Sequence, residues 1–134
     1  MRGRRCVWLL IIFGGLCSLA AQSAAHDQFL GTWIGTWDGA GSGGFELTLE
    51  KDDNGVLRGK VSVTGEPTYK TTFRTLSFEG SKMSAAYDFP PDDRGEVMLG
   101  ASFDGNAATG TWTLREKADA TKVVASGTWK VTKK

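Results

Sequence analysis

Cysteine and histidine are scarce in this chain of 134 residues, which contains two cysteines and one histidine. Both cysteines, Cys6 and Cys17, lie near the N-terminus, and His26 follows them. From residue 27 onward the chain offers no disulfide, no thiol nucleophile, no imidazole base and no His-rich zinc site. Carboxylates could still act as acid and base, but they fall on polar strand faces and in turns. We therefore predict that the protein is not an enzyme and holds neither a metal nor a cofactor.

An excess of charge of one sign is also lacking. The chain has 16 Lys and Arg residues against 15 Asp and Glu residues, which gives a formal net charge of +1. Such a balance provides no basic surface for a nucleic acid, so we expect no nucleic-acid partner. The length suits one domain with a single hydrophobic core.

Long apolar runs are limited to one, close to the N-terminus. Three arginines precede the run Val7–Phe13, and small residues lead from there to Ala25. This order predicts a signal peptide at residues 1–25 and a single domain at residues 26–134. An uncleaved anchor is the alternative, but the run is short for a membrane span. Because the chain also lacks Asn-X-Ser/Thr sequons, we expect a secreted or periplasmic bacterial protein with no membrane span after leader cleavage.

The rest of the chain alternates apolar and polar residues and shows no helical period. Polar turns divide it into eight strand-like segments of similar length. This pattern predicts an all-β fold, an eight-stranded antiparallel up-and-down β-barrel whose last strand pairs with its first. The predicted strands are residues 29–38, 45–51, 56–64, 69–79, 82–89, 96–104, 107–116 and 121–132.

Turn lengths follow from the requirement that the apolar residues of two paired strands share one face. A three-residue turn at residues 53–55 places Leu49 opposite Gly59, whereas a two-residue turn would place Leu49 opposite Lys60. We therefore predict the three-residue turn. A two-residue turn at Gly105-Asn106 sets the register of a later hairpin in the same way.

The tripeptide Gly-Thr-Trp occurs four times, at residues 31–33, 35–37, 110–112 and 127–129. In an extended strand each glycine shares a face with its tryptophan, and the threonine takes the other face. Closing the barrel would place all four copies on three neighbouring strands. The tryptophans are then either plain core residues or a stacking surface for an apolar ligand.

The last hairpin is expected to pair each large indole with a small residue. Trp112 should lie opposite Ala125, and Gly110 should lie opposite Gly127. The glycine pair is where we expect any hollow inside the barrel.

Arg74 and Tyr87 form the most specific candidate pair. A two-residue turn at Gly80-Ser81 would place Arg74 opposite Tyr87 on the inner face. A buried guanidinium needs a partner, so Arg74 could bind a ligand carboxylate with Tyr87 as a second donor. The alternative is a slip or bulge in the irregular segment 69–79 that turns Arg74 outward. The candidate ligand-binding residues are Trp33, Trp37, Arg74, Tyr87, Trp112 and Trp129.

The acidic segment Asp88–Glu96 is a candidate calcium site, because hard cations bind clustered oxygen ligands. It lacks the alternating acidic positions of an EF-hand loop, and Arg94 opposes a cation there. We interpret the segment as a solvent-exposed turn.

Three short stretches follow one another near the start of the predicted domain: Gly31-Thr32-Trp33, Phe45–Leu49 and Gly55–Gly59. In this order they resemble the first three strands of the calycin superfamily, which includes lipocalins and avidins. The resemblance implies a small ligand-binding β-barrel. Where avidins carry polar contacts to biotin, this chain has glycine or valine: Gly35, Gly39, Val61 and Val63. Biotin binding is therefore not expected.

Three classes of function fit the pattern. The first, which we favour, is an exported small β-barrel that binds a small apolar or carboxylate-bearing ligand inside, as a monomer or a homo-oligomer. The second is a protein-interaction module, such as a secreted protease-inhibitor-like barrel without a small-molecule ligand. The third is a transmembrane barrel with its apolar face toward lipid, for which the chain is short.

Overall fold

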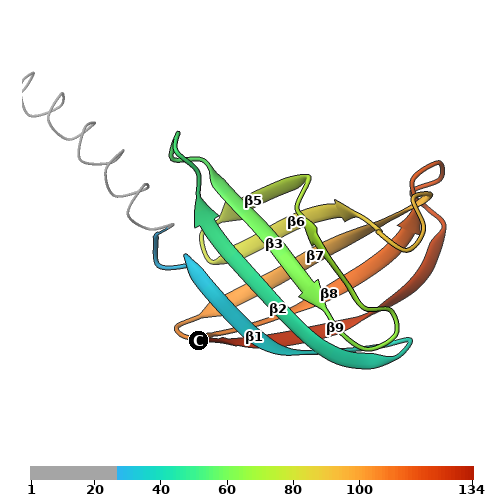
Figure 1. The fold of residues 1–134 in the computed structure, drawn as a ribbon, viewed down its shortest axis with the longest axis horizontal. Coiled ribbons are helices and arrows are strands. Elements are labelled where there is room, and N and C mark those ends of the chain that lie inside the picture. Colours follow the sequence, from blue (N-terminus) through green and yellow to red (C-terminus); the bar gives the residue numbers. More distant parts are fainter. Residues whose placement is uncertain (1–26) are drawn as a thin grey trace, which may run out of the picture.

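The computed structural model describes residues 27–134, so the predicted signal peptide at 1–25 and His26 lie outside the described residues. Within this range the chain forms nine antiparallel strands (Figure 1). No helix in the range is long and apolar enough to cross a membrane. The strands are β1 (Gly31–Asp38), β2 (Ser42–Lys51), β3 (Leu57–Val63), β4 (Tyr69–Thr72), β5 (Thr75–Glu79), β6 (Lys82–Asp88), β7 (Gly95–Asp104), β8 (Ala107–Glu116) and β9 (Val123–Lys133).

All nine strands belong to one sheet, in the order β4-β3-β2-β1-β9-β8-β7-β6-β5. Apart from β4 and β5, strands that follow one another in the chain are neighbours in the sheet, and β1 pairs with β9 as the sequence predicts. The sheet curls into a half-barrel (Figure 1). Its apolar side chains form one buried cluster inside it. Its two edges, β4 and β5, are joined directly by Phe73 and Arg74.

The expected count of eight strands is wrong because the segment 69–79 forms two strands. The N–H of Phe73 donates to the carbonyl of Gly59 in β3 at 2.8 Å, and the N–H of Arg74 donates to the carbonyl of Ala86 in β6 at 2.8 Å. The chain thus leaves one sheet edge and joins the other within two residues. One continuous strand would keep every second residue on the inner face. The inward side chains instead have odd residue numbers in β4 and even residue numbers in β5, so the strand has to break between them.

Most of the predicted strand pairings are confirmed. The turn at residues 53–55 places Leu49 opposite Gly59, and the Gly105-Asn106 hairpin places Leu99 opposite Trp112. The last hairpin is wrong by two residues: Trp112 lies opposite Gly127 rather than Ala125. The loop before β9 is longer than expected, and a bulge at Leu114/Arg115 shifts the register.

This register makes two Gly-Thr-Trp units pair with each other. Thr111 lies opposite Thr128, so Gly110 faces Trp129 and Trp112 faces Gly127. The expected hollow between the two glycines is therefore absent, because an indole covers each glycine. The absence of a Cβ is required here: a Cβ on Gly127 would lie 2.7 Å from Nε1 of Trp112 and 1.9 Å from the carbonyl oxygen of Asp38.

Between residues 27 and 134 there are four tryptophans, and the indole N–H group of each has a backbone acceptor. Trp33 donates to Phe29 at 3.0 Å, Trp37 to Thr64 at 3.0 Å, Trp112 to Asp38 at 2.9 Å and Trp129 to Thr111 at 3.0 Å. Each large ring thereby connects its strand to another part of the chain, and its polar atom is satisfied.

The two ends of the half-barrel differ. One end, here called the hairpin end, carries the connections β2–β3, β5–β6 and β7–β8. The other, here called the loop end, carries the connections β1–β2, β3–β4, β6–β7 and β8–β9. Phe29 fills the hairpin end: its ring stacks on Phe78 at 4.5 Å between centroids and lies 5.1 Å from Phe103. The loop end has a cavity.

Candidate functional site

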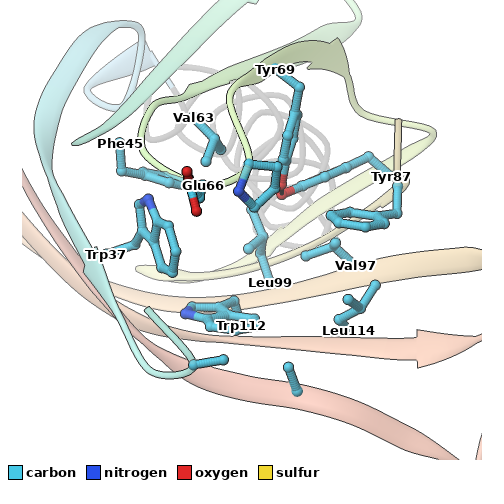
Figure 2. A pocket seen from close by; sticks show the side chains of 14 residues that line it. Trp37, Phe45, Val63, Glu66, Tyr69, Tyr87, Val97, Leu99, Trp112 and Leu114 are labelled. Carbon is cyan, nitrogen blue, oxygen red and sulfur yellow. Dashed lines mark hydrogen bonds between the residues drawn. The ribbon is translucent and has the colours of Figure 1, made fainter. Parts of the chain in front are cut away.

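A cavity of about 150 Å³ opens at the loop end of the half-barrel. Figure 2 shows the labelled side chains arranged around it, with the indoles of Trp37 and Trp112 and the phenol rings of Tyr69 and Tyr87 contributing to its wall. The lining is mainly apolar and aromatic. It consists of Trp37, Ala40, Phe45, Val63, Glu66, Pro67, Tyr69, Tyr87, Phe89, Val97, Leu99, Trp112, Leu114 and Ala125.

The loop between β3 and β4 is held against the Trp37 side of the cavity. The indole N–H of Trp37 donates to the carbonyl of Thr64, where this loop begins. The hydroxyl of Thr68 donates to the carbonyl of Gly65 at 2.8 Å, which closes the loop as a tight turn. Trp37 also contacts Trp112 edge to face, with ring centroids 5.9 Å apart and an interplanar angle of 84°.

A pair of tyrosines forms the facing part of the wall. The hydroxyls of Tyr69 and Tyr87 share a hydrogen bond of 2.7 Å, in which either can be the donor. Burial raises the pKa of Tyr87, and burial also raises that of Tyr69. Both phenols are therefore neutral at physiological pH. Phe89 packs edge to face on Tyr69, with ring centroids 5.7 Å apart and an interplanar angle of 84°.

Glu66 is the one charged residue that lines the cavity. Its side chain is exposed at the entrance, and Figure 2 shows its carboxylate among the aromatic rings. Within residues 27–134 this carboxylate has no hydrogen bond and no ion pair. Two other carboxylates at the loop end do have basic partners: Asp88 contacts Arg74 and Lys117, and Glu116 contacts Lys122.

No family model matches this chain. No curated protein matches it either. The calycin resemblance therefore stays a prediction, and the site has to be interpreted from its own geometry.

Three of the six predicted binding residues line the cavity. Trp37, Tyr87 and Trp112 meet there, from β1, β6 and β8. Trp33 and Trp129 are buried in the core instead, where Trp33 contacts Phe103.

The prediction that Arg74 points into the barrel is wrong. Its side chain is 46% exposed and lies outside the cavity, because the break between β4 and β5 turns it outward. Its guanidinium pairs with Asp88 and, at 2.7 Å, with Glu96. Arg115 reaches the second carboxylate oxygen of Glu96 at 2.8 Å. Arg74 thus connects the sheet edge at β5 to β6 and β7, and it has carboxylate partners of its own.

Glu96 is the most buried carboxylate in this network, with the whole residue 8% exposed. Hydrogen bonds from Arg74 and then Arg115 hold the pKa of Glu96 below its usual 4.5. A lowered folded-state pKa stabilises the fold above the unfolded pKa, and that stability is lost as the pH falls through the folded value.

Replacing Glu96 by Gln should lower the free energy of unfolding by about 1–3 kcal/mol at pH 7. The difference from the original protein should shrink as the pH falls below 4.5, where the carboxylate of the original protein becomes protonated in the unfolded chain. Urea unfolding at pH 7 and pH 3 measures both effects. Glu46→Gln, on the exposed face of β2, is the control and should change stability little. An equal loss at both pH values would contradict the assigned role.

Carboxylates of the segment Asp88–Glu96 pair with basic side chains. Asp92 accepts hydrogen bonds from the side chain and backbone of Arg94, and these lower the pKa of Asp92 from 3.8 to about 2. Among residues 27–134 there is no group of three or more His, Cys, Asp or Glu side chains that could hold a metal ion.

Eleven of the fourteen lining residues were not among the predicted binding residues, Glu66, Pro67, Tyr69 and Phe89 among them. Glu66 and Pro67 resembled ordinary turn residues. Tyr69 could have been found, because it lies opposite Val63 and therefore shares the inner face with it.

Proposed function

We propose that this protein binds a small, mainly apolar ligand in the loop-end cavity. The observation that carries the proposal is an aromatic cavity that opens at one end of a half-barrel whose other end is filled by Phe29. A dry apolar cavity of about 150 Å³ is large enough for a single ring such as benzene. The ligand, or the buried part of it, is therefore a compact group of that size.

A binding role is favoured over catalysis by the chemistry of the lining. Tyr69 and Tyr87 are the polar groups deepest in the wall, and their raised pKa values keep both from acting as a base at neutral pH. Arg74 already pairs with Asp88 and Glu96 outside the cavity, so it is not placed to bind a ligand carboxylate there. We propose an exported binding protein, with the protein-interaction module as the alternative.

Filling the cavity is the direct test. The neutral probe 3,3-dimethyl-1-butanol should shift the indole N–H signals of Trp37 and Trp112 in NMR spectra of the labelled protein, and leave that of Trp33 unchanged. Ala125→Leu places a larger side chain in the lining and should weaken this binding at least about ten-fold. Ala107→Leu, at an exposed position of β8, should bind like the original protein.

Two results would contradict the proposal. One is that no probe binds, which would favour the protein-interaction module. The other is that Ala125→Leu binds the alcohol as well as the original protein does, which would place the probe elsewhere.

A further inference from the structure

We propose that the ligand carries a positive charge, as an ammonium group that is free or methylated, held between the aromatic rings and the carboxylate of Glu66. The inference rests on the proposed function and specifies the chemical class of its ligand. It follows from three features of the cavity: its aromatic rings, the single charged residue in its lining, and the anchored loop that carries this residue.

The rings form two right-angled pairs within the lining. Trp37 and Trp112 meet at 84°, and Tyr69 and Phe89 meet at 84°. Aromatic faces carry partial negative charge and attract cations within about 6 Å of the ring centroid. Tryptophan is the strongest of these rings, and tyrosine attracts cations in the same way. A compact cation in this cavity would have several such faces within reach.

Glu66 adds a full negative charge at the entrance. No Lys or Arg belongs to the described lining, and nothing in residues 27–134 pairs with this carboxylate. Asp88, Asp92 and Glu116, which belong to the same end of the half-barrel, each have a basic partner. Among the carboxylates of the described residues, Glu66 is the one that lines the cavity, so its charge is available to a bound ammonium group.

The position of Glu66 relative to the rings is set by the backbone. Trp37 donates to the carbonyl of Thr64, two residues before Glu66, and the turn that follows is closed by Thr68. The carboxylate is thus attached to a segment anchored on one of the cavity's own rings. An anionic ligand would meet repulsion from Glu66 and from the ring faces.

Three probes of nearly the same shape separate charge from size: choline, 3,3-dimethyl-1-butanol and 3,3-dimethylbutanoate. Their affinities for the full chain can be compared by following the indole N–H signals of Trp37 and Trp112. We expect choline to bind about ten-fold more tightly than the alcohol, and the carboxylate to bind most weakly. Glu66→Gln should remove most of the advantage of choline over the alcohol.

Glu46→Gln is the matched control, because it removes one carboxylate from an exposed strand position outside the cavity. It should leave all three affinities as they were. The inference is overturned if the alcohol binds as tightly as choline, or if the advantage of choline survives Glu66→Gln. If none of the three probes binds, the proposed function itself is overturned, and the charge inference with it.

Discussion

Gly110→Ala should lower the free energy of unfolding by about 3 kcal/mol or more, beyond the usual range for one added methyl group in a packed interior. The added methyl would lie 2.0 Å from the carbonyl oxygen of Gly100 and 2.8 Å from Cε2 of Trp129. The first contact is with the backbone of β7, so no side-chain rotation can relieve it. Either the β7–β8 pairing or the indole has to move.

Thermal unfolding monitored by circular dichroism measures this effect, and the midpoint should fall by more than about 10 °C for a domain of this size. Gly100→Ala is the matched control, because its methyl would have only an ordinary contact, 3.6 Å from Oγ1 of Thr111. We expect that variant to be as stable as the original protein. Similar stability for the two variants would mean that the Gly110–Trp129 pairing is not as close as described.

Phe29→Ala should lower the free energy of unfolding by about 3–5 kcal/mol, the usual cost of truncating a buried phenylalanine. Phe29 is 4% exposed and fills the hairpin end, where its ring stacks on Phe78. Its loss would let water reach the core beneath Trp33, whose indole N–H donates to the carbonyl of residue 29. Urea unfolding of the variant measures the loss.

Ile34→Ala is the control for this truncation, since Ile34 is 41% exposed on the outer face of β1. A change within about 0.5 kcal/mol is expected there. If Phe29→Ala proves equally mild, residues before β1 do not close the half-barrel, and the hairpin end must be sealed by the strands alone.

The alternation of side chains made most of the fold predictable. Parity alone selected the three-residue turn at 53–55, because a shift of one residue would have put Lys60 among the apolar side chains. Parity cannot detect a shift of two residues, which returns every side chain to the same face. That is why the pairing of Trp112 with Gly127 was missed, although both Ala125 and Gly127 satisfied the pattern.

The site was less predictable, because it depends on where the strands stop. Trp37, Tyr87 and Trp112 were predicted because the alternation of side chains along each strand places them on the inner face. Glu66 reaches the cavity from a loop, whose path no periodicity specifies. Arg74 was placed on the wrong face because the inward side chains of this segment change from odd to even residue numbers. Tyr69 and Phe73 point inward before the change, and Leu76 and Phe78 after it. Such a change signals a break in the strand.

The central place of β9 in the sheet order has a consequence for how the protein folds. The strand nearest the C-terminus pairs with both β1 and β8, so two meanders, β1 to β4 and β5 to β8, have no strand pairing with each other until β9 has been synthesised. Pairing β1 with β9 also joins residues far apart in the chain, which slows folding. The complete sheet therefore forms late, when both meanders are present and β9 joins them.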